Sequence, residues 1–461
     1  MRFIRLIVLS VVAISAISCR LDSQVLAEFN GGDVRRSELR AAFRLMEGQP
    51  SLEMQDRVVT DLALLKITAL EAVKQGLDQT EDFKKREPLF HKLAFLGSLE
   101  QELMAEQKKQ KFKMMELQFA FLKEGEKDKK RKPEAEDIAK KLNEASDSDR
   151  EKIIAQKTEM KRYAVTGGYA DPICVSCVPN PFAFLTDAAA KAEGKFVVVD
   201  DPNGFWIIRK AQETEVSGDS LSETYEAYFK KAARLSRTAI AAMPEGAEKK
   251  EMEAQTMKEA QIETVSKQIA EQQVKRESQG LLQKRIEQRK KSLGLEALPG
   301  LRSYFDEKTD VAKDLSAPVI KMGGKDITLG ELLQGLPEDK TVDRRQLLQQ
   351  IVLPYEILKE DPLAAAALKS PQHDFLMAWN RNNQLAVLFL GKQNLPEITE
   401  AQVLERFNAG FAGQNFGQLH DRIKADLTQE MRQGKLKQIQ DGLGKQYNLK
   451  INKDKLKGGE L

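Results

Sequence analysis

The sequence predicts a predominantly α-helical α+β protein. Charged residues make up 31% and aromatic residues only 6% of its 461 residues, a balance typical of long solvated helices around thin cores. Apolar residues recur at spacings of three and four over much of the chain, and short alternating stretches lie between these segments. A compact β-sandwich is therefore not expected, and at about 150 residues per domain the length predicts two to four domains.

The N-terminal segment has the features of an export signal. Arg2 and Arg5 precede an apolar stretch at 6–17. As a helix, this stretch would rise about 18 Å, which is too short for a bilayer core of about 30 Å. No later segment approaches the length of apolar sequence that spans a membrane, so we expect the rest of the chain to be soluble.

The residues Ala16-Ile17-Ser18-Cys19 resemble a bacterial lipobox, in which the cysteine is acylated and becomes the first residue of the mature chain. This resemblance implies that residues 1–18 are a lipoprotein signal peptide and that Cys19 is the lipidation site. The lipid would then tether the protein to a membrane. Ordinary secretion and an uncleaved anchor are the alternatives.

A gapless internal repeat relates residues 25–39 to residues 318–332. In each copy we expect a short strand, a glycine turn, a β-branched residue and the start of a helix. The identical pairs are Gly31 and Gly324, Asp33 and Asp326, Glu38 and Glu331, and Leu39 and Leu332. We therefore predict two similar modules, at 19–113 and 301–461.

Both modules are expected to be mostly helical. Apolar residues at helical spacing follow the first copy at Val58, Leu62, Leu65, Ala69 and Val73, and again at Leu89, Leu93, Leu96 and Leu103. Pro88 should begin or kink the second of these helices, because proline lacks an amide donor. After the second copy we expect helices around 344–353, 375–390, 400–407 and 419–447.

Residues 114–213 mix strands and helices. Residues 117–122 alternate in the manner of a half-buried strand, and a helix is expected from Pro133. Residues 196–199 and 205–208 flank an Asp-Asp-Pro-Asn-Gly segment, which predicts a β-hairpin. The basic run at 127–132 is expected to be a solvated loop, and contact with anionic lipid is the alternative.

Residues 214–300 form a predicted long helical arm. Residues 247–293 are rich in Glu, Lys, Gln and Ala and contain no proline and a single glycine, Gly280. A helix over this stretch would be about 70 Å long, so we expect an arm that packs on the two modules. A coiled coil is the alternative, although the apolar residues drift from a strict heptad.

The order of these segments resembles that of the SurA/PrsA-like extracytoplasmic chaperones, which carry an inserted parvulin-type peptidyl-prolyl isomerase domain. The strand at 117–122, the turn at Gly167-Gly168 and the sequence Gly-Phe-Trp-Ile-Ile at 204–208 are similar to the first strand, glycine turn and last strand of a parvulin. The resemblance implies two SurA-N-like helical modules with a parvulin-like α/β domain between them.

The parvulin-like domain departs from the family at its histidine pair. Phe119 and Trp206 stand at those positions, and no histidine lies between His91 and His373. Because the pair organises the floor of the parvulin site, we expect weak or absent isomerase activity and assign no catalytic residue. Aromatic side chains here would instead hold unfolded segments, or simply fill the domain core. The candidate client-binding residues are Phe119, Phe121, Phe182, Phe184, Phe205 and Trp206.

The sequence Cys174-Val-Ser-Cys177 lies in a proline-rich segment. In an exported protein, two such cysteines usually pair, so a local disulfide is the first interpretation. Free thiols or bonds to another protein are the second. A redox function is the third, but the surroundings do not indicate the helix N-terminus that commonly stabilises a reactive thiolate.

Composition and missing motifs exclude several classes of function. Lys and Arg total 73 against 70 for Asp and Glu, a formal net charge of +3, so no nucleic-acid partner is implied. The three histidines and three cysteines are too scattered for a local zinc site. The sequence has no nucleotide-binding or common hydrolase motif, and we expect neither a metal nor a cofactor.

Together these features predict a lipid-anchored extracytoplasmic chaperone that binds unfolded secreted or outer-membrane polypeptides. It is expected to face the periplasm, and Arg20 does not distinguish the inner from the outer membrane. One alternative is an active peptidyl-prolyl isomerase that uses other groups, Cys174 or Thr166 among them. Another is a non-catalytic scaffold lipoprotein that binds one folded partner. Client identity and oligomeric state are not predicted.

Overall fold

The computed structural model describes residues 23–46, 51–124, 131–177, 180–306, 315–337, 343–393, 398–411 and 413–457. The predicted leader, Cys19 and positions 127–130 of the basic run lie outside these ranges. The chain divides into two compact units, and the boundaries fall within two long helices. Unit 1 comprises residues 1–46, 50–101 and 286–461, and unit 2 comprises residues 47–49 and 102–285. The domain borders expected at 113, 213 and 300 stay predictions.

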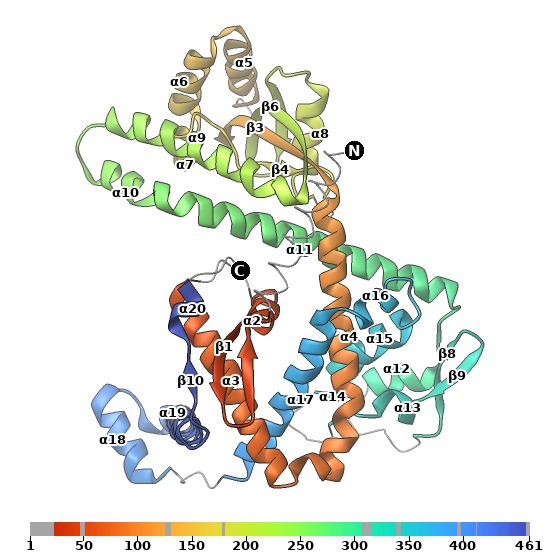
Figure 1. Cartoon of the computed structure of the whole chain (residues 1–461). Helices are drawn as coiled ribbons and strands as arrows, with labels where there is room; N and C mark the ends of the chain where they lie inside the picture. Colours follow the sequence, from red (N-terminus) through yellow and green to blue (C-terminus); the bar gives the residue numbers. More distant parts are fainter. Residues whose placement is uncertain are drawn as a thin grey trace, which may run out of the picture. The chain divides into compact units, whose positions relative to one another are not determined.

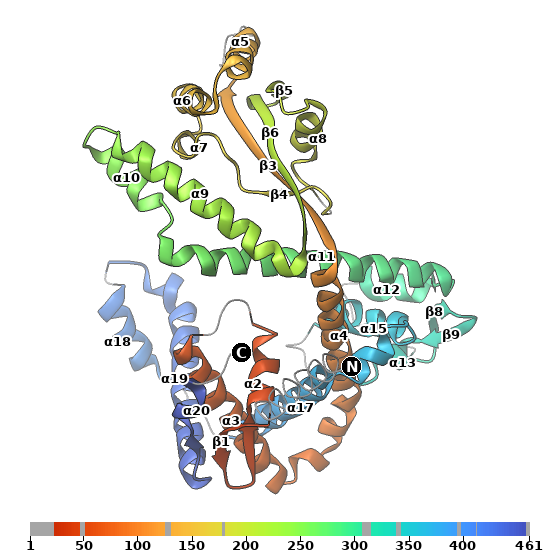
Figure 2. The ribbon, with the colours of Figure 1, turned by 45° about the horizontal axis from the view of Figure 1, so that its top comes forward.

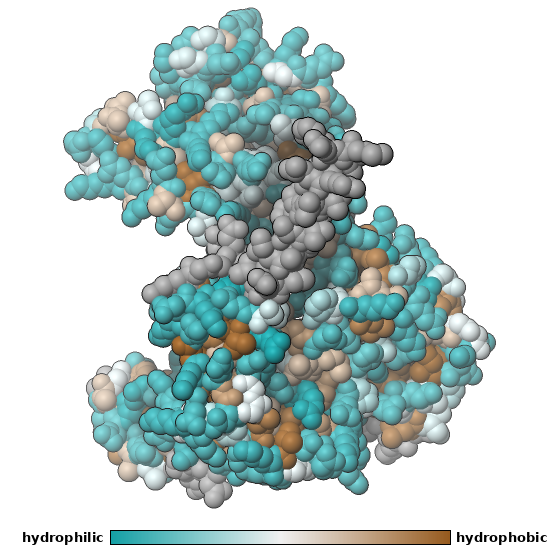
Figure 3. All heavy atoms as spheres, in the orientation of Figure 1, coloured by the Kyte–Doolittle hydropathy of each residue, from teal (hydrophilic) through white to brown (hydrophobic). Residues whose placement is uncertain are grey.

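The predicted fold class is confirmed. Helices predominate, and the strands form three small antiparallel sheets, in the orders β10-β1-β2, β4-β3-β6-β5 and β7-β8-β9. Within the described part of the chain, no helix is long and apolar enough to cross a membrane. On the face drawn in Figure 3, hydrophilic residues cover most of the described surface and hydrophobic residues form scattered patches.

Each copy of the sequence repeat forms a β-hairpin in unit 1, in which the expected strand, glycine turn and helix are present and the β-branched residue lies on a second short strand that was not predicted. β1 (Val25–Phe29) pairs with β2 (Gly32–Arg35), and β8 (Pro318–Met322) pairs with β9 (Lys325–Thr328). A helix follows each hairpin directly and carries the glutamate that the two copies share. Glu38 accepts a hydrogen bond from the Arg35 backbone N–H, and Glu331 accepts one from the Thr328 backbone N–H.

Two very short strands, which the sequence analysis did not predict, complete the hairpin sheets. β10 (Lys450–Ile451) pairs with β1, and β7 (Glu296–Ala297) pairs with β8. β10 comes from the opposite end of the chain from the hairpin that it joins, whereas β7 shortly precedes its hairpin in the sequence. The first hairpin sheet is therefore a long-range assembly.

Helices make up the rest of unit 1, and the predicted helical stretches are confirmed. Their bounds are α2 (Arg36–Phe43), α3 (Leu52–Lys74), η1 (Leu77–Gln79), α4 (Glu81–Lys109), α12 (Pro299–Asp306), α13 (Leu329–Leu333), α14 (Arg344–Leu347), η3 (Leu348–Val352), α15 (Leu353–Leu358), α16 (Ala364–Leu368), α17 (Pro371–Gly391), α18 (Glu400–Gly410), α19 (Phe416–Gln446) and α20 (Lys453–Lys457). Pro88 lies inside α4. One core packs β1 and β2 against α3 and α17 (Figure 1), and a second packs β8 and β9 against η3 and part of α4.

The sheet of unit 2 consists of β3 (Lys111–Lys123), β4 (Ile173–Cys174), β5 (Val197–Asp201) and β6 (Gly204–Ser217). The predicted hairpin is confirmed, since β5 pairs with β6 around the expected turn. The half-buried strand expected at 117–122 is corrected, because β3 is buried on both faces. Helices α5 (Arg131–Glu144) and α6 (Asp147–Lys157) cover one face, and α8 (Ala183–Lys191) covers the other (Figure 2).

The structure corrects the arm in two respects. The stretch 247–293 is not one helix, because the backbone is extended at Thr256, between α10 (Ala247–Gln255) and α11 (Glu259–Ser292). The arm also packs on the sheet of unit 2 up to Arg285, whereas its end from Ile286 belongs to unit 1. Tertiary packing has outweighed local helix propensity here. The preceding helix, α9 (Leu221–Ala241), brings the aromatic side chains that make this contact.

Candidate functional site

One face of the unit 2 sheet carries a cluster of aromatic side chains. Phe119 and Phe121 alternate along β3, and Trp206 lies beside them on β6, where it is the direct partner of Phe121. The ring centroids of Phe119 and Trp206 are 5.1 Å apart, and those of Phe121 and Trp206 are 4.7 Å apart. Tyr163 adds a fourth ring, 4.8 Å from Phe119. These tilted pairs lie in the range of favourable aromatic contacts.

A glycine turn fixes Phe119 in this cluster. The Phe119 backbone N–H donates to the Gly168 carbonyl oxygen at 2.8 Å. Gly168 has a φ of +81°, and a Cβ on it would lie 2.3 Å from the Phe119 carbonyl oxygen. Only glycine fits this close approach. The Gly167-Gly168 pair thus holds the strand that carries the aromatic floor.

A cavity of about 390 Å³ opens beside the aromatic cluster. Its floor comes from the sheet, and its walls come from the segment around Tyr163, the start of α8, and the two arm helices α9 and α11. The lining residues are Leu117, Phe119, Met160, Tyr163, Ala170, Asp171, Pro172, Ile173, Cys174, Cys177, Asn180, Pro181, Phe182, Leu185, Trp206, Ile208, Tyr225, Phe229, Ile269, Gln273 and Arg276. This volume lies within the usual range for ligand pockets, and the lining is mostly apolar.

Polar contacts fasten the arm to the sheet around this cavity. The Tyr228 hydroxyl donates to the Tyr169 carbonyl oxygen at 3.1 Å. Lys231 pairs with Glu116 of β3 at 2.8 Å, and its ammonium lies 3.5 Å from the centroid of the Tyr169 ring. The arm is therefore a fixed wall of the cavity, held by a hydrogen bond, an ion pair and a cation–π contact.

Cys174 and Cys177 are joined in a disulfide that forms part of the cavity wall. Both cysteines are buried. Cys174 belongs to the edge strand β4, and the Gln273 side-chain amide of α11 donates to the Cys177 sulfur at 2.9 Å. The disulfide thus joins β4 to the loop that leads to α8, and this loop contacts the arm in the cavity wall.

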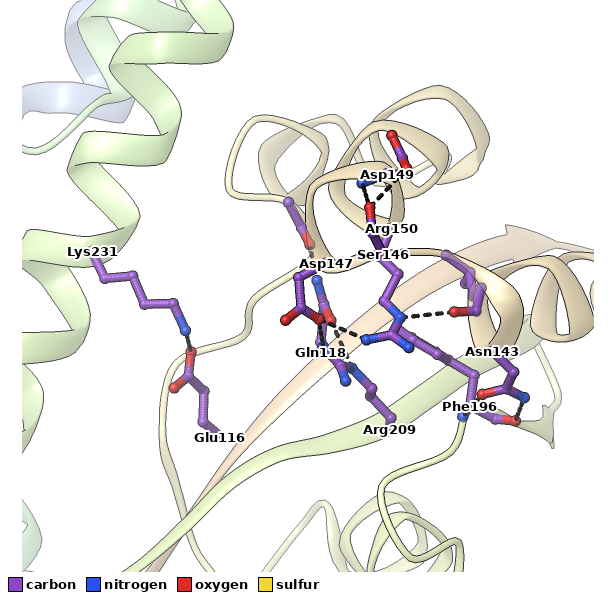
Figure 4. Close-up of polar contacts among 12 residues, drawn as sticks. Glu116, Gln118, Asn143, Ser146, Asp147, Asp149, Arg150, Phe196, Arg209 and Lys231 are labelled. Carbon is purple, nitrogen blue, oxygen red and sulfur yellow. Dashed lines mark hydrogen bonds and ion pairs between the residues drawn. The ribbon is translucent and has the colours of Figure 1, made fainter.

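A polar network supports the opposite face of the sheet. Figure 4 shows Arg150 and Arg209 converging on Asp147, with nitrogen–oxygen distances of 2.6 and 3.3 Å. These arginines lower the pKa of Asp147, with the Arg150 hydrogen bond as the largest cause. Arg209 also donates to the buried Gln118 side chain, which in turn donates to the Gly167 carbonyl oxygen. The network therefore holds the glycine turn from behind and lies away from the cavity.

The two tyrosines of the cavity favour binding over proton transfer. Burial raises the pKa of Tyr225 to about 12 and raises that of Tyr163. Both phenols therefore stay protonated at neutral pH, where a general base needs a pKa near the working pH. The described residues hold no cluster of three or more His, Cys, Asp or Glu that could bind a metal ion. The arrangement is suited to holding an apolar group.

The predicted client-binding residues do not all reach the cavity. Phe119, Phe182 and Trp206 line it. Phe121 is buried on the same face of the sheet, and Phe184 is 44% exposed on α8. Phe205 packs on the opposite face, against the core beneath α5 and α6. The structure therefore brings together half of the predicted set.

Sequence reasoning missed the arm's contribution to the cavity. Tyr225 and Phe229 lie four residues apart on α9, and Ile269 and Gln273 are likewise four apart on α11. Residues at this spacing share one face of a helix. The signal was present in the aromatic cluster around Tyr228, because aromatic residues are unusual in a solvated arm.

Comparisons with known proteins give a family but no activity. A family model described only as ":-like" matches residues 1–328, which is more than half of the chain, so the chain belongs to that family. No curated protein matches the chain. The crystal structure of PrsA from Bacillus subtilis matches at 16% sequence identity, covering 51% of this chain and 100% of that chain, with a TM-score of 0.19. A likeness at this TM-score carries no argument about function.

Proposed function

We propose that the chain is a lipid-anchored extracytoplasmic chaperone that holds apolar side chains of unfolded exported or outer-membrane polypeptides in the cavity of unit 2. The parvulin-like domain acts in this proposal as a binding domain with weak or no isomerase activity. Cys19 carries the lipid, and the chaperone faces the periplasm. The observation that carries the proposal is the aromatic cavity, with an exposed phenylalanine at its edge.

The size of the cavity supports binding of one side chain at a time. A dry cavity of about 150 Å³ accommodates benzene, so about 390 Å³ has room for an aromatic, aliphatic or prolyl group with adjoining backbone. Burial of one such side chain contributes about 1.5–3 kcal/mol. Because a dissociation constant of 1 mM already corresponds to about 4 kcal/mol, a single contact exchanges readily. A holding chaperone needs such weak, repeated contacts.

The residues at the floor support holding rather than catalysis. Phe119 and Trp206 bring an apolar surface to the place where the resemblance implies two imidazoles. Rotation about a prolyl bond has a barrier of about 20 kcal/mol, and only interactions stronger in the transition state lower it. An apolar floor binds the ground state and the transition state about equally.

Phe182 and Phe184 offer a matched pair of variants for the test. Their exposed fractions are 47% and 44%, but only Phe182 lines the cavity. The soluble protein starting at Arg20 is mixed at rising molar ratio with an unfolded outer-membrane β-barrel protein diluted from urea, and light scattering is followed. We expect the parent and Phe184→Ala to suppress scattering and Phe182→Ala to suppress it less. Equal suppression by both variants would place the client elsewhere.

A second readout uses the tryptophans. The chain has two, Trp206 in the floor of the cavity and Trp379 in unit 1. In the Trp379→Phe background, a phenylalanine-containing peptide should change the Trp206 emission, and a serine-substituted peptide should not. Rapid turnover of a proline peptide by the same protein would instead support the isomerase, and suppression restricted to one folded partner would support the scaffold.

A further inference from the structure

Unit 1 is built from two copies of a longer structural repeat than the sequence shows, and the sheet of unit 2 is inserted in the first copy. The first copy begins at β1 and ends at α12, and the second begins at β8 and ends at α20. Each copy starts with a hairpin and ends with a closing segment, defined here as the end of a long helix, a short strand and a short helix. The closing segments are α11-β7-α12 in the first copy and α19-β10-α20 in the second.

The two hairpins correspond residue by residue. Ala27 pairs with Val34 as Ile320 pairs with Ile327, and every other residue pair between β1 and β2 has its counterpart between β8 and β9 at one constant offset along the chain. Both ladders also shift register at the same place, after Val25 and after Pro318. A shared irregularity is stronger evidence of equivalence than a shared hairpin.

The two closing segments also correspond. The long helices end before Asn448 and Gly294, which have left-handed φ values of 52° and 55°. The next backbone N–H groups, of Leu449 and Leu295, each donate at 2.9 Å to the carbonyl oxygen five residues back. The N–H groups of Asn452 and Leu298, which follow the strands, donate to equivalent carbonyls of the two hairpins, on Leu26 and Val319.

The copies exchange these closing segments. The hairpin of the first copy pairs with β10 of the second, and the hairpin of the second copy pairs with β7 of the first. The helices follow the same rule. α3 of the first copy packs on α17 of the second, and α15 of the second packs on α4 of the first, where the Phe95 and Tyr355 rings are 5.2 Å apart.

We propose that unit 1 is the intrachain counterpart of a two-fold dimer, in which two copies of one subunit, fused in tandem, exchange their closing strands. The partner of each hairpin sheet is thus the other half of the same chain. This inference does not depend on the proposed chaperone function. Only the first copy carries the sheet and cavity of unit 2, between its α4 and its closing segment, so the second copy completes the fold of the first and adds no cavity of that kind.

Charge complementarity specifies the exchanged pairing. Glu28 lies opposite Lys450, and Lys321 lies opposite Glu296. All four residues are exposed. Without the exchange, Glu28 would face Glu296 and Lys321 would face Lys450. Opposite charges across a strand pair stabilise it and like charges destabilise it, so these residues favour the observed partners and oppose the alternative ones.

Side-chain size also favours the exchanged pairing, at the residue pairs next to the charged ones. Ala27 lies opposite Ile451, and Ile320 lies opposite Ala297. Each observed pair combines one small and one large side chain. Without the exchange, one pair would be Ala with Ala and the other Ile with Ile. Ile451 is half-buried and Ala297 is exposed, so side-chain size supports the exchange more weakly than charge does.

Cross-linking of the full chain from Arg20 tests the proposal. The variant Glu28→Cys/Lys450→Cys should form a disulfide under mild oxidation, identified by mass spectrometry of unreduced tryptic peptides. The matched variant Glu28→Cys/Glu296→Cys places the same residue opposite its non-exchanged partner and should not cross-link. The reverse result for the two variants would overturn the exchange.

Charge inversion tests whether the sequence specifies the pairing. The variant Lys450→Glu/Glu296→Lys puts like charges opposite each other in both sheets and should lower the melting temperature of unit 1 by about 1–4 °C, read from Trp379 in the Trp206→Phe background. Adding Glu28→Lys/Lys321→Glu restores opposite charges and should recover the parent value. Equal melting of all three proteins would overturn the role assigned to these charges.

Discussion

The sheet of unit 2 and the two hairpin sheets of unit 1 acquire their stability in different ways. The unit 2 sheet has one long central pair, β3 with β6, which is buried between helices on both faces. The hairpin sheets are small, and each is completed by a two-residue strand from outside the hairpin. The sheet of unit 2 is stabilised mainly by its own core, whereas the two hairpin sheets are stabilised mainly by contacts with other parts of the chain.

This difference explains what each region can do. A sheet with a large core of its own can leave an apolar cavity at one side, because its remaining contacts maintain the fold. The hairpin sheets instead share cores with helices from other parts of the chain, and the specificity of their closing strands lies in a few complementary pairs. We expect substitutions to affect one unit without the other, and we expect the cost to follow burial in unit 2 and long-range bonding in unit 1.

The largest expected effect is a core truncation in either unit. Ile207 of β6 and Ile67 of α3 are both fully buried, and Ile→Ala at such a site costs about 2–5 kcal/mol. Ile207→Ala should lower the urea midpoint of Trp206 and leave that of Trp379 unchanged, and Ile67→Ala should do the reverse. The single-tryptophan backgrounds Trp379→Phe and Trp206→Phe separate the signals. If either variant shifts both midpoints equally, the two units unfold as one.

The next effect concerns a buried arginine of the first hairpin module. The Arg36 side chain is fully buried, donates to the Gln24 side chain at 2.8 Å, and donates to the Lys455 carbonyl oxygen of α20. Leu329 stands at the equivalent position of the second module. Arg36→Leu therefore imitates the other copy but leaves two partly buried acceptors without this donor, at a cost of about 1–3 kcal/mol.

The Trp379 midpoint in urea measures this loss in the Trp206→Phe background. Arg35→Leu is the control, because Arg35 is exposed and pairs with Asp33 at the surface. The control should leave the midpoint nearly unchanged. If the Arg36→Leu protein is as stable as the control, a leucine at this position, as in the second module, stabilises the first module as well as the buried arginine does.

The sequence predicted those features whose signals are local. Strand alternation, the turn residues at 200–204 and helical periodicity each act over a few residues, and the corresponding hairpins and helices are present. β7 and β10 have two residues each, too few to show any periodicity. Their pairing depends on which segment meets which hairpin, and this information lies in cross-strand complementarity rather than along the strand.

The candidate site shows the same limit. The floor residues Phe119 and Trp206 were predicted from a strand pattern and a resemblance, whereas the wall from α9 and α11 was not. An arm rich in charged residues indicates a solvated helix, and nothing local says which surface its few aromatic residues cover. The burial of β3 was likewise underestimated. It was predicted to be buried on one face only, because the helices that cover its two faces follow later in the chain.

A smaller effect is expected at the contact that fixes the arm to the sheet. Tyr228→Phe removes the hydrogen bond from the phenol to the Tyr169 carbonyl oxygen and should cost about 1 kcal/mol. Hydrogen exchange in 221–241, the helix that carries Tyr228, should increase, because this helix then detaches from the sheet more often. Tyr225→Phe is the control, since it removes a phenol of the same helix and keeps that bond. Equal exchange in both variants would mean that apolar packing alone holds the arm.

The smallest effect is a pH dependence confined to unit 1. The His91 and His373 rings are 5.5 Å apart, and the ammonium of Lys92 lies nearby, paired with Glu356 at 3.5 Å. Burial lowers the pKa of His91, and the positive charges that His373 and Lys92 can carry lower it further. The unfolded chain, with an ordinary histidine pKa of about 6.5, then binds more protons than the folded protein as the pH falls. Stability is therefore full above about pH 6.5 and declines below it.

Replacement of the ring separates this titration from packing. His91→Phe keeps an aromatic ring against Tyr355, which His91 contacts edge-on at 5.8 Å, and removes the proton-binding site. Between pH 7.5 and 5.5 the Trp379 melting temperature of the parent should fall by more than that of the variant, while the Trp206 melting temperatures of both should change alike. His420 provides the opposite sign, since its bonds to Asp421 and Glu400 raise its pKa, so its contribution grows as the pH falls. A parent that is stabilised by acid would therefore show that the surface histidine outweighs the buried pair.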